Sequence, residues 1–340
     1  MKMNQLIAAG ILFLSAASCN VQPSTPMNIY WIDVEGGAAT LIITPSGESI
    51  LMDAGWATED ERDAKRIVAA MDDAGITKID YFIASHFHSD HVNGLPALVK
   101  RIPIEQFIDH GNSVEQDRPG SLKAWESYIS VAQQGKRRTI VPGETLLLTG
   151  IDLTFVTSNR EVLDQAMVNS SPNAHCENAS PGKEDTGENA SSVGYLLSLG
   201  AFDFLNLGDL TVDIQHKLAC PTNLIGEIDL YQVPHHGNGI APQLSWALSP
   251  TAAVLNNGPH KGGSPEGYEV ISSIPDIKAI WQVHRALDTD DKHNSSAQMT
   301  ANLTEENDAG YWIKATVQAD GSSYLIENER NKYSETYQTK

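Results

Sequence analysis

The sequence predicts an α/β fold, in which short strands and helices alternate along the chain. The first observation is a series of apolar runs at 28–34, 40–45 and 49–55, separated by glycine-containing turns as strands of a sheet are. The second is an amphipathic repeat over 59–75, where apolar side chains recur at helical spacing. The third is the apolar run 79–84, which reads as a buried strand. A strand, a helix and a further strand in this order form a βαβ unit.

The remaining elements follow from the same two periodicities. Apolar runs that end in glycine or polar residues mark further strands, and helical spacing recurs between them. The closing segment alternates in a period of two and turns at Asp320 and Gly321, as a terminal hairpin does. The elements expected after residue 84 are helices at 95–101 and 125–132, and strands or strand pairs at 106–111, 141–158, 188–210, 230–234, 252–257, 280–284 and 310–329.

Length and charge set bounds on the function. The chain has 340 residues, 41% of them hydrophobic, so it can bury a large core. Its net charge of −20 repels anions, and it offers no long basic stripe for an extended nucleic-acid surface. The one basic run, 136–138, is interpreted as a solvated loop. The expected partner is a small-molecule substrate, and the sequence does not define the oligomeric state.

The first residues have the composition of an export signal. Lys2 precedes an apolar run at 6–14, and small residues then lead to Cys19. This pattern resembles a bacterial lipoprotein signal over 1–18, which implies that Cys19 is lipidated and that 19–27 is a tether. The protein would then be exported, as a periplasmic or outer-surface lipoprotein that meets the membrane only through this anchor. Ordinary secretion stays open, because an alanine stands where the lipoprotein pattern usually has leucine.

Residues 159–188 differ in character from the rest of the chain. They are rich in Asn, Ser, Pro, Gly and Glu, which predicts a long loop or lid. The segment contains His175, interpreted as a surface histidine, and Cys176. In an exported protein Cys176 and Cys220 either form a disulfide or stay as two free buried thiols.

A dense polar cluster directly follows the strand 79–84. Within six residues it contains His86, His88, Asp90 and His91. Side chains alternate along an extended backbone, so the first two histidines project to the same side and can grip one metal ion. The aspartate and the third histidine follow in the turn and can reach a second ion. Two ions about 3.5–4 Å apart are a known hydrolytic device.

This H-x-H-x-D-H cluster resembles the signature of the metallo-β-lactamase-fold hydrolases. The run 31–55 is also similar to the opening of one branch, the hydrolase domain of bacterial competence (DNA-uptake) channel proteins and its free-standing relatives. The resemblance implies a four-layer αββα sandwich of two mixed sheets over 28–330, with 331–340 as a tail. It also places Asp53 near the metal site, as a partner of a histidine ligand or as a simple turn residue.

The resemblance implies further site residues after later strands. Asp209 matches the aspartate that bridges the two metals, and it follows the strand pair 188–210. One of His235 and His236 should be a ligand of the second metal; the following glycine favours His236, and the reverse assignment stays open. Lys261 lies in a glycine-rich loop and is the natural cation to hold a substrate oxyanion or phosphate.

One position departs from the commonest pattern of the superfamily. Many relatives have a third histidine for the first metal about twenty residues before the bridging aspartate, and here that residue is Asn189. The competence-type branch is similar in having asparagine there. Asn189 is therefore a possible third ligand through its amide oxygen, and His110, at the end of a neighbouring strand, is the alternative.

The ligand set implies a hydrolytic mechanism with two divalent ions, zinc or manganese. They would lower the pKa of a bridging water towards neutrality, Asp90 or Asp209 would accept its proton, and Lys261 would stabilise developing charge. A small phosphodiester or other phosphate-containing compound is the expected substrate. The alternatives are a lactone, a β-lactam or a carboxylic ester, or a non-catalytic lipid-anchored module that only binds metal.

Overall fold

The computed structural model describes residues 25–305 and 309–340. The predicted signal peptide, Cys19 and most of the predicted tether lie outside these residues. The end of the tether is already part of the fold, since Met27 is fully buried and begins the first strand. In the described ranges, none of the helices has both the length and the apolar character needed to cross a membrane.

One mixed sheet is built from both ends of the chain. Its centre is antiparallel, because β1 pairs with β18 on one side and with β2 on the other. The pairing becomes parallel from β3 through β4 and β5 to β6. In spatial order the strands are β20 (Ser334–Gln338), β19 (Ser323–Asn328), β18 (Ile313–Val317), β1 (Met27–Trp31), β2 (Thr40–Ile43), β3 (Ser49–Met52), β4 (Ile79–Ile83), β5 (Ile104–Asp109) and β6 (Lys136–Thr139).

The second mixed sheet comes from the middle of the chain. It is antiparallel from β7 to β12 and parallel from β12 to β17. In spatial order its strands are β17 (Thr300–Asn302), β16 (Ala279–His284), β15 (Ala252–Leu255), β14 (Leu230–Gln232), β12 (Phe202–Asn206), β11 (Gly194–Leu199), β8 (Asp152–Ser158) and β7 (Thr145–Leu147), with β9 (Glu161–Val162) beside β8.

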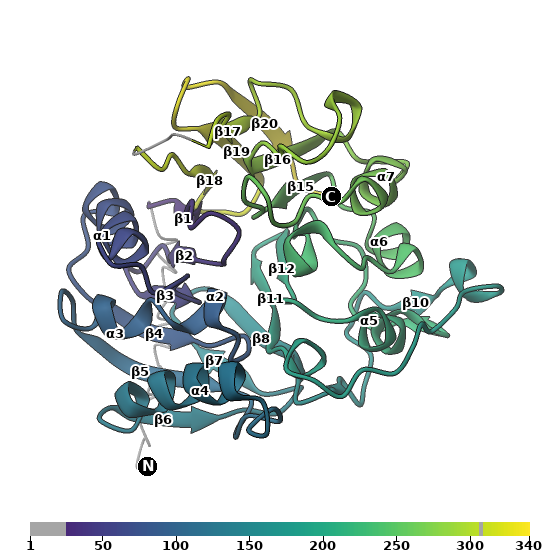
Figure 1. The fold of residues 1–340 in the computed structure, drawn as a ribbon. Helices are drawn as coiled ribbons and strands as arrows, with labels where there is room; N and C mark the ends of the chain where they lie inside the picture. Colours follow the sequence, from purple (N-terminus) through teal and green to yellow (C-terminus); the bar gives the residue numbers. More distant parts are fainter. Residues whose placement is uncertain (1–24, 306–308) are drawn as a thin grey trace, which may run out of the picture.

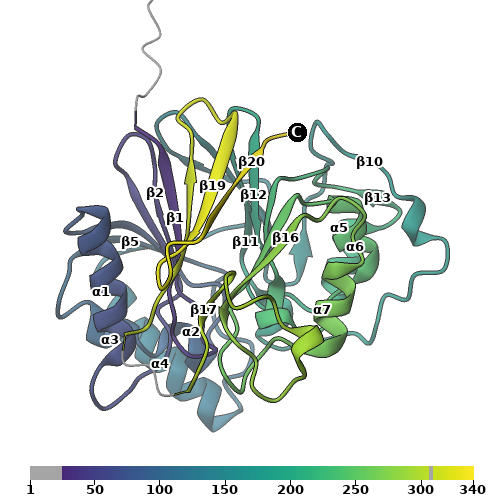
Figure 2. The same ribbon diagram turned by 90° about the horizontal axis from the view of Figure 1, so that it is seen from above.

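Helices cover the outer faces of both sheets, and Figures 1 and 2 show the four layers. On the first sheet lie α1 (Arg62–Ala74), α2 (Ser89–Val92), α3 (Leu95–Leu98) and α4 (Pro119–Ala132); on the second lie α5 (Val212–Ala219), α6 (Pro242–Leu248) and α7 (Pro265–Ser272). Three apolar clusters fill the spaces between the layers. The middle one joins the two sheets through large side chains such as Trp31, Phe204 and Trp281. The αββα sandwich expected from the sequence is therefore confirmed.

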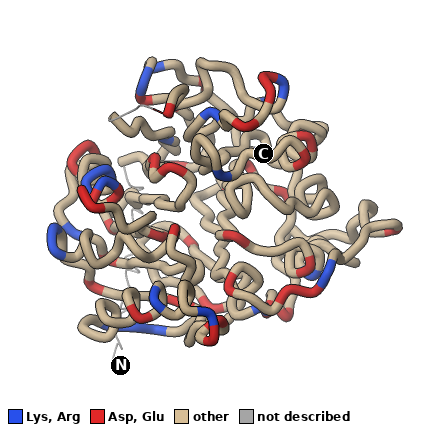
Figure 3. Tube along the Cα trace, in the orientation of Figure 1, with Lys and Arg blue, Asp and Glu red and all other residues tan. Residues whose placement is uncertain are grey.

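Two edge strands were not expected from the sequence. The run 136–138, interpreted as a loop, lies in β6 and pairs in parallel with β5. The predicted tail 331–340 contains β20, which extends the sheet beyond residue 330. Both strands are mostly exposed, so neither carries the apolar alternation that marks a half-buried strand. Along the described residues, Lys and Arg lie scattered among Asp and Glu (Figure 3), and the full sequence has 23 of the basic and 43 of the acidic residues.

The segment 159–188 runs along the outside of α5 and α6 and is tied to them. Cys176 and Cys220 form a disulfide, which decides between the two alternatives for these cysteines. The side chain of Asn173 donates hydrogen bonds to the carbonyl oxygens of Ala219 (3.0 Å) and Gln243 (2.9 Å). In addition, β10 (Ser171–Pro172) pairs with β13 (Thr222–Asn223). The predicted loop is thus anchored along the helices of the second sheet.

Replacing both Cys176 and Cys220 by serine is expected to lower the free energy of unfolding by about 2–4 kcal/mol. The bond closes a chain segment with a sequence separation of 44, and closing a loop of this size restricts the unfolded chain by up to about 4 kcal/mol. Urea unfolding of the oxidised protein and of the double variant measures the difference. Equal midpoints and slopes for the two proteins would contradict this prediction.

Candidate metal centre

The predicted ligands converge where the two sheets meet at one edge. The carboxyl end of β4 leads to His86, that of β12 to Asp209, and that of β14 to His236. A backbone hydrogen bond from His235 N to the Gly208 oxygen (3.0 Å) joins the ends of β14 and β12. Another, from Val193 N directly before β11 to the Ser85 oxygen (2.8 Å), ties the end of β4 to the second sheet. A side chain at Gly208 would place its Cβ 2.8 Å from the Cβ of Ser85, so this approach requires glycine.

His86 and His88 face each other at the end of β4. Nε2 of His86 lies 3.0 Å from Nδ1 of His88. Their outer nitrogens are held by other groups, since Nδ1 of His86 contacts the Ser85 hydroxyl at 3.0 Å and Nε2 of His88 contacts a Glu115 oxygen at 3.2 Å. Each ring is therefore held through one nitrogen, and its second nitrogen faces the other histidine. Metal-binding histidines are commonly held in this way through the nitrogen that does not bind the metal.

A second group, of four buried residues, lies beside this pair. Each of its residues offers one ligand atom, and these atoms all lie within 4.8 Å of one another. The residues are Asp90, His91, Asp209 and His236. Asp209 Oδ2 is 3.2 Å from Nε2 of both His91 and His236, and Asp90 Oδ2 is 3.2 Å and 3.4 Å from the same two nitrogens. Two carboxylates and two imidazoles thus surround one point.

The groups that hold His91 and His236 in place lie outside the cluster. Asp53 Oδ2 is 2.7 Å from Nδ1 of His91 and also accepts a 2.7 Å hydrogen bond from the Ser85 hydroxyl. His236 Nδ1 lies 3.2 Å from the backbone oxygen of Asn256. Asp53 therefore has the role of a partner of a histidine, which was one of the two expectations for it.

His235 and His236 are adjacent in the turn after β14, but their side chains lie in different surroundings. Both residues have φ in the left-handed region, at 51° and 55°, and Asn238 N donates a 2.9 Å hydrogen bond to the His235 oxygen, so they lie in a tight turn. His236 is fully buried in the cluster, whereas 31% of the His235 side chain is exposed and its Nε2 is 4.0 Å from Asp209 Oδ2. The geometry favours His236 as the ligand and leaves His235 facing the mouth of the site.

Alanine substitutions of this pair are expected to have different effects. His236→Ala should lower metal affinity by at least about 10-fold, because it removes a cluster nitrogen that no neighbour replaces. His235→Ala should keep the metal content and change turnover instead. Metal per chain after equilibrium dialysis, with turnover measured in parallel, checks both statements. Equal metal loss in the two variants would show that both rings are ligands.

Lys261 brings a cation to the cluster. Its ammonium group contacts a carboxylate oxygen of Asp90 and lies 3.4 Å from Nε2 of His236. It also lies 5.1 Å from the ring centre of Trp56, so its approach is lined by an aromatic face. The predicted place of Lys261 beside the metal site agrees with this geometry.

Asn189 and His110 were the two candidates for a third ligand of the first metal. Asn189 Nδ2 lies 3.2 Å from Nε2 of His235, and its buried Oδ1 has no hydrogen-bond partner. His110 is packed against Phe87, and its Nε2 is 3.1 Å from a Glu188 oxygen. The structure thus directs Asn189 toward the site and pairs His110 with a buried carboxylate instead.

Comparison with known proteins shows which family the first histidine cluster resembles. The family model described as the metallo-beta-lactamase superfamily matches residues 32–156, which include the whole first histidine cluster. This part of the chain therefore matches the metallo-β-lactamase superfamily. It is 25% identical over 254 residues to a UPF0173 metal-dependent hydrolase of Cupriavidus necator, covering 71% of this chain and 78% of that protein. The finer resemblance to the competence-type branch stays a prediction.

Two solved structures are similar to the chain at low sequence identity. The metallo-beta-lactamase fold protein YhfI of Bacillus subtilis has a TM-score of 0.47 and 13% identity, over 85% of this chain and 99% of that one. CmlA, a diiron beta-hydroxylase of Streptomyces venezuelae, has a TM-score of 0.39 and 13% identity, over 75% of this chain and 48% of that one.

The residues present fit metal ions of the kind that this superfamily suggests. Nε2 of His91 is buried and makes no hydrogen bond of good geometry, and Oδ1 of Asn189 is in the same situation. Burial would lower the pKa of His91, but Asp209 and Asp90 outweigh it and hold that pKa well above its ordinary value. The carboxylates of Asp90 and Asp209 thus stabilise a positive charge between them. Imidazole nitrogens and carboxylate oxygens together suit zinc or manganese.

Two acidic residues of the site were missed from the sequence. Glu115 contacts His88, and Glu188 accepts a 2.9 Å hydrogen bond from the backbone nitrogen of Phe87, between the first two histidines. Glu115 belongs to no motif in the sequence, and Glu188 was noted only as the first residue of the predicted strand pair 188–210. Glu188 directly precedes Asn189, the candidate third ligand, and this adjacency is the signal in the sequence that points to it.

Proposed function

We propose that this protein is an exported hydrolase that uses two bound divalent metal ions to split a small phosphodiester. The observation that carries the proposal is the convergence of four imidazole nitrogens and two buried carboxylates on one edge of the sandwich. Export, the lipid anchor at Cys19 and a periplasmic or outer-surface location rest on the sequence of the first residues alone.

Two overlapping sets of side chains would hold the ions. His86, His88 and the amide oxygen of Asn189 would serve one, while Asp90, His91 and His236 would serve the other; Asp209 would be shared. Bound ions of this type lower the pKa of a water molecule towards neutrality and polarise the oxygens of the bond under attack.

The side chains around the cluster then have separate tasks. Lys261 is placed to neutralise an anionic oxygen of the substrate, which favours a phosphodiester over an uncharged ester. Burial lowers the pKa of His235, and although Asp209 opposes this, the net shift is downward, so its ring is neutral near pH 7. Asn189 Nδ2 lies beside Nε2 of His235, where it can donate to that nitrogen and fix the ring at the mouth of the site.

The first experiment measures metal in the protein produced from Asn20 onward without chelator. About two ions of zinc or manganese per chain are expected, with a loss in His88→Ala, because that variant removes one of the facing nitrogens. His260→Ala is a matched control, since His260 is half-exposed and pairs with Asp288 at 3.0 Å. No metal in the unaltered protein, even after reconstitution, would contradict the proposal.

The second experiment separates phosphoryl from acyl chemistry. Turnover of bis(p-nitrophenyl) phosphate is compared with that of p-nitrophenyl acetate and nitrocefin, with His88→Ala as the blank. Phosphodiester turnover that disappears in the variant supports the proposal. Turnover of the acetate or of nitrocefin alone would favour the ester or β-lactam alternative, and full metal content without any turnover would favour the binding module.

A further inference from the structure

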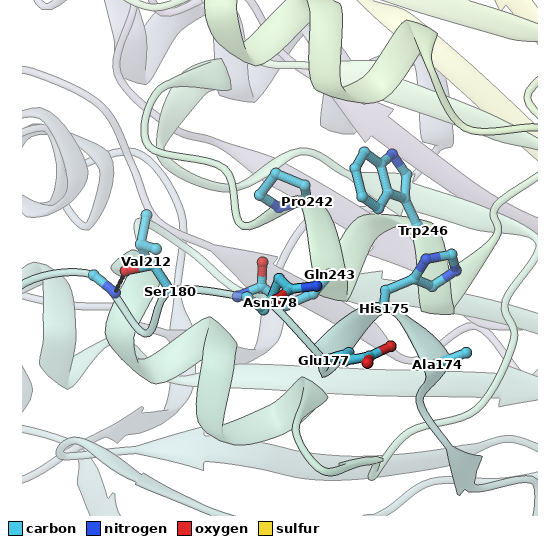
Figure 4. Close-up of a pocket in the computed structure, with 11 residues that line it drawn as sticks. Ala174, His175, Glu177, Asn178, Ser180, Val212, Pro242, Gln243 and Trp246 are labelled. Atoms are coloured by element: carbon cyan, nitrogen blue, oxygen red, sulfur yellow. Dashed lines mark hydrogen bonds between the residues drawn. The ribbon is translucent and has the colours of Figure 1, made fainter.

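A cavity of about 540 Å³ lies between segment 159–188 and helices α5 and α6 (Figure 4). This volume is in the range of pockets that hold small organic molecules. Val212, the first residue of α5, stands at one end in the close-up, and Trp246 of α6 with His175 at the other. The function proposed above involves the metal centre and not this cavity.

The Val212 end of the cavity adjoins the metal centre. Val212 follows Asp209 by three residues in the chain. A Cβ placed on Gly239 would lie 3.8 Å from Val212 Cγ2 and 3.8 Å from His235 Nδ1. One glycine therefore separates the cavity wall from the histidine at the mouth of the site.

The walls of the cavity suit an uncharged ring. Trp246 and His175 meet edge to face, with ring centres 5.4 Å apart, and Val212, Pro242 and Ala179 add apolar surface. Among the described residues that line it, Glu177 is the one charged residue and there is no lysine or arginine, so an anionic group would find no counter-ion and would be repelled by Glu177. Binding of a planar aromatic group would be stabilised by burial against the apolar walls and by contacts with the two rings.

The wall formed by segment 159–188 is fixed in place. The disulfide Cys176–Cys220 and the hydrogen bonds of Asn173 hold it against α5 and α6 on the side where the lining residues lie. A pocket that exists before binding avoids the cost of ordering a loop around its ligand.

We propose that this cavity binds an uncharged aromatic substituent of the substrate while the scissile phosphodiester lies at the metal centre. The inference rests on the proposed function and narrows its substrate class to aryl or arylalkyl phosphodiesters. The reacting group and the aromatic group occupy two sites that meet at His235 and Gly239.

The test has a binding arm that does not depend on turnover. Calorimetry measures the affinity of 2-naphthylmethanol for the metal-loaded protein and for Trp246→Ala and Ala179→Phe, which act on opposite walls. Both variants are expected to weaken binding by about tenfold, since one removes a ring contact and the other fills the cavity. Trp312→Ala is the matched control, because Trp312 packs against Tyr30 on the first sheet. Equal affinity in all four proteins would overturn the proposal.

The turnover arm uses two diesters with the same leaving group, methyl p-nitrophenyl phosphate and 2-naphthylmethyl p-nitrophenyl phosphate. KM for the naphthylmethyl diester is expected to be about tenfold lower, and both cavity variants should bring the ratio of the two KM values towards one. A ratio that the variants leave unchanged would overturn the proposal, even if the alcohol binds. If neither diester is hydrolysed, the proposed function fails, and the binding arm still decides whether the cavity takes an aromatic group.

Discussion

Asp209→Asn is expected to lower turnover at least about 100-fold and to reduce the number of metal ions bound per chain. Asp209 Oδ2 lies 3.2 Å from the facing nitrogens of both His91 and His236. Burial raises the pKa of Asp209, but those two histidines outweigh it and hold the pKa well below its usual range, so the group is a buried anion. Asparagine keeps the shape and removes the charge, and a buried cation then loses one of its two carboxylates.

The measurement is metal per chain together with turnover of bis(p-nitrophenyl) phosphate. Asp203→Asn is a suitable control, because Asp203 lies on the same strand, β12, and contacts Ser198 rather than the cluster. The control should keep its metal and its turnover. If Asp209→Asn bound as much metal as the unaltered protein and turned over as fast, the shared-ligand role would be wrong.

The parts of the site that the sequence predicted are those where local chain geometry alone brings ligands together. His86, His88, Asp90 and His91 follow one buried strand, so their proximity depends only on a strand end and one turn. Asp209 and His236 lie far along the chain, and they were placed through the family resemblance. The parallel pairing of β12 with β14 explains why their ends meet.

The features that the sequence did not predict depend on contacts between distant residues. The carboxylate of Glu188 and the backbone nitrogen of Phe87 are 101 residues apart, and no periodicity links them. The disulfide depended on the distance between Cys176 and Cys220, which spacing does not supply. Edge strands such as β20 are held by pairing on one side and bury few side chains, so their sequences resemble loops.

Glu188→Gln is expected to destabilise the fold by about 3 kcal/mol and to weaken metal binding by about 10–100-fold. Glu188 is fully buried and accepts hydrogen bonds from Val114 N (2.7 Å), the Ser113 hydroxyl (2.6 Å) and Phe87 N (2.9 Å), besides its contact with His110. Burial would raise the pKa of Glu188, but His110 and Ser113 outweigh it and hold the pKa at about 2. In glutamine, an NH2 group replaces one carboxylate oxygen. It would face the N–H and O–H groups that now donate to Glu188 and could not accept their hydrogen bonds.

The effect on metal should arise through the backbone, because Phe87 lies between His86 and His88 and Glu188 fixes its amide. Urea unfolding measures the stability, and competition with a chromophoric chelator at a temperature where the variant is folded measures the affinity. Glu161→Gln, an exposed change on β9, should alter neither. Glu188→Asp keeps the charge with a shorter reach, so it should recover part of the stability and less of the affinity. If Glu188→Gln were destabilised and still bound metal as tightly as the unaltered protein, Glu188 would support the fold without positioning the ligands.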